Sequence, residues 1–176
     1  MKKNSYDENN LKTGFWEETY ESGQLMNVGR YEKGAKQGIW KSYWENGNLK
    51  TINNFVNGVK NGSYELYDTG GDILINGSYL NGLKSGLYLF YYRDSKIMFK
   101  GSFLDNKEHG YWEKFWSNGV LESKGEYLNG LKNGYWEYYW TNGNIQSKGC
   151  YIDGVEVGDW VSYEINGSVD KVTQFK

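Results

Sequence analysis

Proline is absent from this 176-residue chain, and cysteine and histidine occur once each. The single cysteine, Cys150, excludes an internal disulfide, and one histidine with one cysteine cannot build a closed metal site. Basic and acidic residues nearly balance at a net charge of -2, which argues against nucleic acid and anionic membranes as partners. The chain also lacks an apolar run of membrane-spanning length and an N-terminal secretory signal. These absences predict a cytoplasmic protein with no integral membrane segment.

Glycine and aromatic residues are abundant instead, and glycine-punctuated aromatic runs predict short strands and turns. Glycine recurs at an unbroken spacing of 24 residues, at Gly14, Gly38, Gly62, Gly86, Gly110, Gly134 and Gly158. A fixed period of this length marks a repeat architecture. We therefore predict a polar N-terminal segment, residues 1–13, and an array of about seven 24-residue repeats over residues 14–176. The N-terminal segment either caps the first hairpin or stays disordered.

Two glycine-containing turns are predicted in each repeat, whose positions are numbered from the leading glycine. Asn-Gly fills positions 9 and 10 in four repeats, and Asn-Gly between apolar runs favours a two-residue type I′ hairpin turn. These pairs are Asn46-Gly47, Asn118-Gly119, Asn142-Gly143 and Asn166-Gly167. The second turn, around positions 19–24, is expected to be longer, with its aliphatic residues tucked under the sheet edge. In the fourth repeat Ser95 and Asn106 replace turn glycines, so we expect a locally different turn around residues 94–107.

A two-residue turn at positions 9 and 10 also sets the register, because residues whose positions sum to 19 then face each other. Trp136 at position 3 opposes Gly149 at position 16, and the ring is expected to lie over that glycine. Glu113 opposes Lys124 on the other face as a cross-strand pair of opposite charge. The predicted fold is all-β, an elongated and twisted antiparallel ribbon of hairpins.

The repeat follows the pattern G-x-W-x-x-Y-x-x-N-G-x-L-x-x-x-G-x-Y-x-x-G-x-x-x. This pattern resembles the MORN repeat, in the variant form found in many bacterial proteins. The resemblance covers residues 14–176, with local departures such as Asn53 at position 16 of the second repeat. It implies a scaffold that interacts with proteins or lipids, in a class often labelled antitoxin-like. No catalytic residues and no cofactor come with the resemblance.

Catalytic chemistry finds little support in the sequence. His109 falls at a position where other repeats carry Gln, Asn or Ser, which is typical of a polar loop residue rather than a catalytic base. Cys150 falls on a predicted polar strand face, and the carboxylates recur at equivalent positions as solvated residues. We expect a protein that is not an enzyme and that binds no metal or cofactor.

The third and fourth repeats differ most from the others, and function is expected where the repeats differ. They carry apolar residues on the otherwise polar face, and this candidate patch consists of Tyr67, Leu74, Leu89, Tyr91 and Met98. We predict that the patch docks a partner protein or a second copy of the chain; the alternative is that the N-terminal segment or sheet curvature covers it. A lipid surface and a glycan or choline ligand are the alternative functions.

Overall fold

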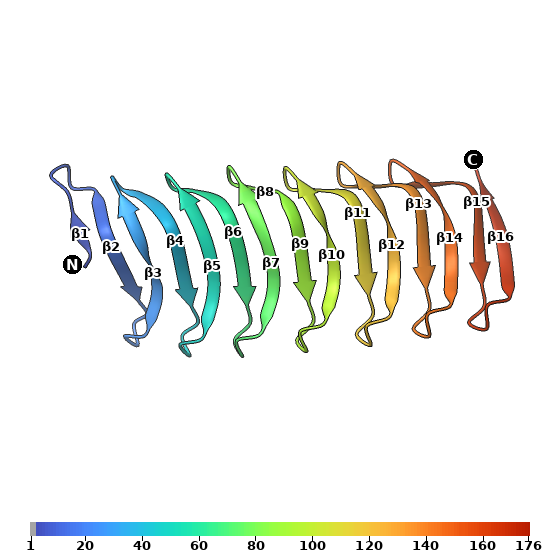
Figure 1. Ribbon diagram of the computed structural model, residues 1–176, viewed down its shortest axis with the longest axis horizontal. Coiled ribbons are helices and arrows are strands. Elements are labelled where there is room, and N and C mark those ends of the chain that lie inside the picture. The colour runs from blue at the N-terminus through green and yellow to red at the C-terminus, as the bar shows by residue number, and fades with distance from the viewer. Residues whose placement is uncertain (1–2) are drawn as a thin grey trace. The chain divides into compact units, whose positions relative to one another are not determined.

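The structure is a computed structural model that describes residues 3–176, and these residues form strands and turns without any helix (Figure 1). The strands pair in antiparallel fashion with their neighbours in the chain. The prediction of an all-β fold of antiparallel hairpins is therefore confirmed.

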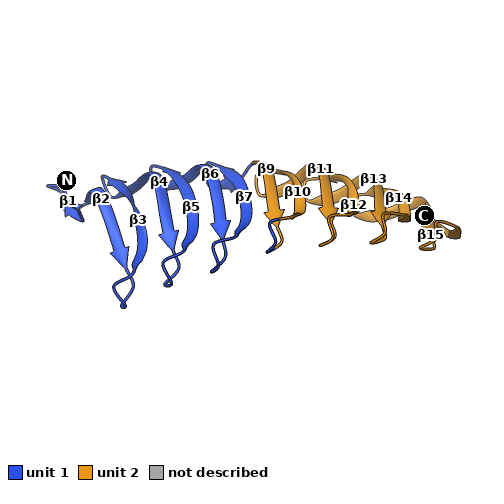
Figure 2. Cartoon of the chain, turned by 60° about the horizontal axis from the view of Figure 1, so that its bottom comes forward, with its two compact units in different colours: residues 1–85, 93–95 blue, residues 86–92, 96–176 orange. Residues whose placement is uncertain are grey.

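The chain divides into two compact units, which Figure 2 colours blue and orange. Unit 1 ends at Ser85 and includes Arg93–Ser95, and unit 2 comprises Gly86–Tyr92 and Lys96–Lys176. The strands of unit 1 are β1 (Ser5–Tyr6), β2 (Lys12–Thr19), β3 (Leu25–Glu32), β4 (Ala35–Tyr43), β5 (Leu49–Val56), β6 (Val59–Tyr67), β7 (Ile73–Leu80) and β8 (Leu83–Lys84). Those of unit 2 are β9 (Gly86–Tyr91), β10 (Ile97–Leu104), β11 (Lys107–Phe115), β12 (Leu121–Leu128), β13 (Leu131–Tyr139), β14 (Ile145–Ile152), β15 (Val155–Tyr163) and β16 (Val169–Phe175). Within each unit the sheet order follows the chain order, and β8 pairs with β7.

The predicted assignment of the two turns is wrong, because their types are exchanged. The type I′ turn lies at positions 20 and 21, where both residues have positive φ, as at Asn129 (54°) and Gly130 (86°). This turn is so tight that Leu128 and Leu131 are cross-strand partners and the next strand already begins at position 22. The expected longer loop over positions 19–24 does not exist.

The turn at positions 9 and 10 is the longer one. Gly119 has positive φ, but Asn118 is not among the residues with positive φ, and the Gly119 amide donates to the Trp116 carbonyl at 2.8 Å. This is a type I turn followed by a left-handed glycine, the usual three-residue hairpin loop with a bulge. As a consequence Phe115, at position 6, pairs with Leu121, where a residue at position 7 was predicted.

The turns of the fourth repeat keep the backbone conformation of the other repeats, against the prediction for residues 94–107. Ser95 and Asn106 take positive φ values of 63° and 68°, as the glycines at their positions do elsewhere. The substitutions therefore change the strain in these turns, since a left-handed conformation is costly for a residue with a Cβ.

The cross-strand register matches the prediction beyond the bulge, since Trp136 partners Gly149 and Gly134 partners Tyr151. The expected position of the ring is wrong, however. A Cβ on Gly149 would lie 2.3 Å from the indole of Trp160, which belongs to the next hairpin. The indole Nε1 of Trp160 also donates to the Cys150 carbonyl at 3.2 Å. Trp40, Trp112 and Trp136 make the same contact with Gly29, Gly101 and Gly125, so each of these rings covers the preceding hairpin and not its own.

The segment before the first repeat caps strand β2, which decides between the two alternatives left by the sequence. Ser5 and Tyr6 pair with Thr13 and Lys12, and the Tyr6 ring meets the Trp16 ring edge-on with centroids 5.3 Å apart. Residues 1 and 2 of the predicted segment lie outside the described residues.

Candidate functional site

The five residues of the candidate patch fall in different units. Tyr67 and Leu74 lie on β6 and β7 of unit 1, whereas Leu89, Tyr91 and Met98 lie on the β9–β10 hairpin of unit 2. All five side chains are partly buried. Leu89 partners Lys100, whereas the register shifts between Ile97 and Phe99, so Met98 has no cross-strand partner on β9.

Tyr67 makes a polar contact that its place in an apolar patch did not indicate. Its hydroxyl donates to the Glu65 carboxylate. This hydrogen bond, together with burial and the charge of Glu65, raises the pKa of Tyr67 to about 12. In unit 1 the patch residue Tyr67 is thus held by a charged neighbour.

His109 and Cys150 lie on β11 and β14, so two strands separate them within the sheet of unit 2. At a strand spacing of about 4.8 Å the side chains are too far apart to act as a catalytic pair. The thiol of Cys150 is exposed, and Nδ1 of His109 is buried without a hydrogen-bond partner. Among residues 3–176 no group of three or more His, Cys, Asp or Glu side chains has a metal-binding arrangement.

Lysine ammonium groups of the chain itself lie over several of the position-3 aromatic rings. In each case the lysine precedes its ring by four residues. In unit 1, Nζ of Lys12 lies 4.4 Å from the Trp16 ring and Nζ of Lys36 lies 4.2 Å from the Trp40 ring. In unit 2, Nζ of Lys132 lies 4.6 Å from the Trp136 ring. A cation over an indole face is attracted by the ring quadrupole, so this contact recurs as part of the repeat.

Glutamate replaces this lysine before two tryptophans of unit 2. Glu108 precedes Trp112 and Glu156 precedes Trp160, again by four residues. The sequence carried this signal, but the substitution acquires meaning only once the lysine is known to lie over the ring.

A hydrogen-bond chain connects Lys132 of one repeat with Glu156 of the next. Nζ of Lys132 donates to the Tyr138 hydroxyl at 2.6 Å, and the Tyr151 hydroxyl donates to Glu156 at 3.3 Å. The hydroxyls of Tyr138 and Tyr151 are 3.1 Å apart, so Tyr138 must be the donor between them. Burial raises the pKa of Tyr138 and lowers that of Lys132.

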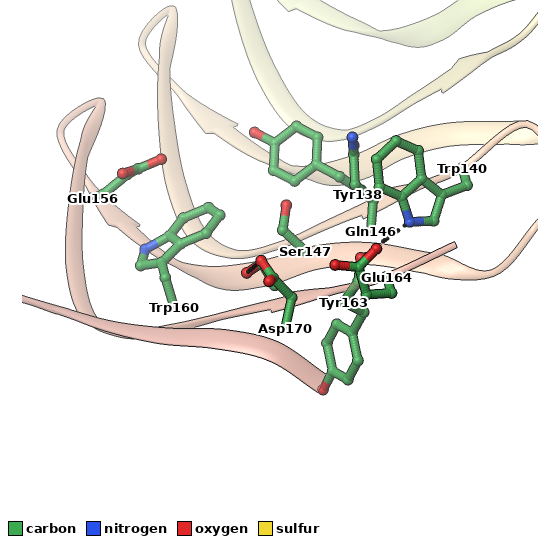
Figure 3. A pocket seen from close by; sticks show the side chains of 10 residues that line it. Tyr138, Trp140, Gln146, Ser147, Glu156, Trp160, Tyr163, Glu164 and Asp170 are labelled. Carbon is green, nitrogen blue, oxygen red and sulfur yellow. Dashed lines mark hydrogen bonds between the residues drawn. The ribbon is translucent and has the colours of Figure 1, made fainter. Parts of the chain in front are cut away.

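A cavity of about 510 Å³ lies beside this series of hydrogen bonds in unit 2, and Figure 3 shows its lining. Aromatic rings and carboxylates surround it: Tyr138, Trp140, Trp160 and Tyr163, with Glu156, Glu164 and Asp170. Gln146, Ser147 and Ser162 complete the lining, so it contains no basic side chain. The cavity thus combines ring faces with negative charge.

A second feature lies at the type I′ turns of unit 2. The side chains that flank two of these turns, at Asn129-Gly130 and Asp153-Gly154, are exposed and form what we call the aliphatic row: Leu128, Leu131, Ile152 and Val155. Val155 is 64% exposed and Ile152 is 59% exposed, and a Cβ on Gly154 would lie 3.6 Å from Cδ2 of Leu131. The prediction that such residues tuck under the sheet edge is wrong, because the tight turn leaves no loop that could fold over them.

Comparisons with known proteins identify the repeat. The family model described as "MORN repeat variant" matches residues 36–57, 108–129 and 132–153. No curated protein matches the chain.

Among solved structures, a mutant of S. aureus TarM in complex with Fondaparinux, alpha-GlcNAc-glycerol and UDP is 19% identical, with a TM-score of 0.36. The match covers 55% of this chain and only 19% of that one.

No helix within residues 3–176 has the length and apolar character that crossing a membrane requires. MORN repeats are generally associated with binding or scaffold roles. Three segments of this chain therefore match the MORN repeat variant.

Proposed function

We propose that this protein is a non-catalytic scaffold that binds a partner protein. The observation that carries the proposal is the aliphatic row of unit 2, whose exposed side chains contribute nothing to the packed ring layer. Contiguous exposed apolar side chains on a soluble surface are typical of interaction sites. The placement of His109 and Cys150 on separate strands supports the non-catalytic part of the proposal.

The experiment is affinity purification from the native cell with mass spectrometry, using the wild-type chain and matched variants. We expect Ile152→Lys with Val155→Lys to lose the partner, because two desolvated charges would oppose an apolar contact. Val169→Lys is the control, since Val169 is 60% exposed and aliphatic but lies away from the type I′ turns. A partner retained by the double variant, or lost equally with the control, would contradict the role of the row.

The candidate patch enters the same experiment as a second set of variants. In unit 2, Leu89→Lys and Met98→Lys place charges on β9 and β10, and in unit 1 Leu74→Lys places one on β7. Loss of the partner with these variants alone would assign binding to the patch instead of the row. Sedimentation velocity of the purified chain tests whether the partner is a second copy.

We propose a narrower form of this function, in which the bound protein is a toxin that the scaffold neutralises. Its support is the resemblance of the repeat to antitoxin-like bacterial proteins. Co-expression with the products of neighbouring genes tests it, with growth as the readout. Growth that is rescued by the wild-type chain but not by the row variant supports neutralisation, whereas a non-toxic partner contradicts it.

A further inference from the structure

The rings of the repeat show what kind of group they hold, because the protein occupies them with its own lysines. Lys12, Lys36 and Lys132 place Nζ between 4.2 and 4.6 Å from the indole four residues later in the chain. Lys132 adds a hydrogen bond from its ammonium to the Tyr138 hydroxyl. A primary ammonium over an indole with a nearby oxygen acceptor is therefore the internal ligand of this ring layer.

Trp160 has lost this internal ligand. The residue four positions before it is Glu156, so a carboxylate replaces the ammonium. Position 5 of the same repeat carries the small Ser162, where the preceding repeat has Tyr138. Glu156 removes a positive charge and Ser162 removes side-chain volume. Both residues line the 510 Å³ cavity beside Trp160.

The charges around the cavity favour a cation. Glu156, Glu164 and Asp170 line it, and the basic side chain nearest along the hydrogen-bond chain, Lys132, donates to Tyr138. Glu156 accepts one hydrogen bond from Tyr151, which leaves acceptor positions on its two oxygens. An entering ammonium would therefore find a ring face and a carboxylate together.

Trp112 provides a comparison within the same unit. Glu108 precedes it as Glu156 precedes Trp160, but the neighbouring cavity is only about 60 Å³. Lys114, at position 5, lines that cavity and forms an ion pair with Glu122 at 2.6 Å. There the Lys114 side chain lines the space, with its Nζ 5.5 Å from the Phe99 ring centroid, so loss of the lysine before Trp112 opens no comparable cavity.

We propose that the cavity beside Trp160 binds a primary ammonium group, such as a lysine side chain of a partner, over the Trp160 ring and paired with Glu156. The ligand replaces the lysine that the other repeats carry. The inference goes beyond the proposed function and does not use the aliphatic row, since Ile152 and Val155 do not line the cavity.

The test is an NMR titration of the Trp160 indole resonance with Nα-acetyl-lysine methylamide. The norleucine analogue, which has the same stem without the ammonium, is the neutral probe, and tetramethylammonium is the quaternary one. We expect saturable binding of the lysine derivative, at least about tenfold weaker binding of the norleucine analogue, and weaker binding of tetramethylammonium, which cannot donate hydrogen bonds to Glu156. Equal binding of the neutral probe, tighter binding of tetramethylammonium, or no saturable shift would overturn the proposal.

Glu156→Lys is the decisive variant, because it restores the residue found at this position in other repeats and so preserves the fold. We expect it to abolish binding, since its own ammonium would cover Trp160. Glu108→Lys makes the same charge change in the same unit and should leave binding within about twofold, because exposed charges more than a Debye length away are screened. Binding that survives in Glu156→Lys, or that falls equally in Glu108→Lys, contradicts the proposed site. A neutral row variant, Ile152→Ser with Val155→Ser, adds no charge beside Glu156 and should bind the lysine derivative normally, so the two proposals fail separately.

Discussion

A Cβ atom on Gly125 would lie 2.3 Å from Cδ2 of Trp136, a residue of the next hairpin. A Cβ added to Gly29 would lie at the same distance from Trp40, and one added to Gly149 at the same distance from Trp160. These glycines have ordinary φ values, so the chain needs them for the close approach of the ring and not for backbone conformation. The indole Nε1 of Trp136 donates to the Glu126 carbonyl at 3.0 Å, which fixes the ring in place.

Gly125→Ala should therefore destabilise unit 2, because the new methyl group meets a ring that cannot rotate away. Overpacking of this kind costs about 1–3 kcal/mol. Urea unfolding followed by circular dichroism measures the loss. Trp136→Ala removes the clash, so it should cost less in the Gly125→Ala background than in the wild type. An unchanged midpoint for Gly125→Ala would contradict the observed packing.

The sequence contained the information that assigns each ring to the preceding hairpin. In unit 1, position 16 is glycine in the first and third repeats but Asn53 in the second. Its same-repeat partner is Trp40, while the corresponding residue of the next hairpin is the smaller Tyr64. If each ring covered position 16 of its own repeat, Trp40 would have to lie over Asn53. The exception therefore indicates that the ring over position 16 comes from the next repeat. The 24-residue period alone was enough to predict the fold class, whereas predicting which hairpin each ring covers required the exception at Asn53.

The turn types were harder to predict, because both turns of a repeat contain Asn-Gly. Tertiary contacts decide between them. The Asn46 side chain accepts from the Asn48 amide and donates to the Thr69 carbonyl in the next turn, at 3.0 and 2.7 Å. A dipeptide rule cannot include a partner 23 residues away. The cavity was equally hidden, because it depends on the absence of volume at Ser162 as well as on Glu156.

Ser95→Gly should stabilise the β9–β10 hairpin. Ser95 holds a φ of 63°, a conformation that costs a residue with a Cβ about 1–2 kcal/mol. Gly119 holds the equivalent position in unit 2 with a φ of 86°, so Gly119→Ser is the reciprocal variant and should destabilise. Thermal unfolding of the two variants tests the pair. Shifts of the same sign would contradict the conformational explanation.

Lys124 has two acidic cross-strand partners, Glu113 and Glu137, but Nζ lies 2.8 Å from Glu137. Burial acts to raise the pKa of Glu137, and the hydrogen bonds from Lys124 and Tyr139 outweigh it, so that the pKa is lowered. A double-mutant cycle should give a coupling of up to about 1 kcal/mol for Lys124 with Glu137 and less with Glu113. A larger coupling with Glu113 would reverse the assignment.

The lowered pKa of Glu137 also predicts a pH dependence. Its contribution to stability is present above the ordinary carboxyl pKa of 4.5 and is lost as pH falls through the lower folded value. Glu137→Gln should therefore show a smaller loss of stability on acidification than the wild type. Urea midpoints measured on both sides of 4.5 make the comparison, and parallel curves would exclude the effect.

Tyr67 makes the opposite prediction, at alkaline pH. Its hydrogen bond to Glu65 raises its pKa from 10.0 to about 12, so the folded state retains this proton more strongly than the unfolded state. The resulting stability is complete below pH 10.0 and declines as pH rises towards about 12. Glu65→Gln removes the negative charge and should return the Tyr67 pKa towards 10.0, which NMR of ring-labelled tyrosine can follow. Tyr139, which donates to Glu137 at 2.8 Å in unit 2, is the internal control and should titrate unchanged in that variant. A Tyr67 pKa that stays raised after loss of the Glu65 charge would show that burial, and not the carboxylate, holds its proton.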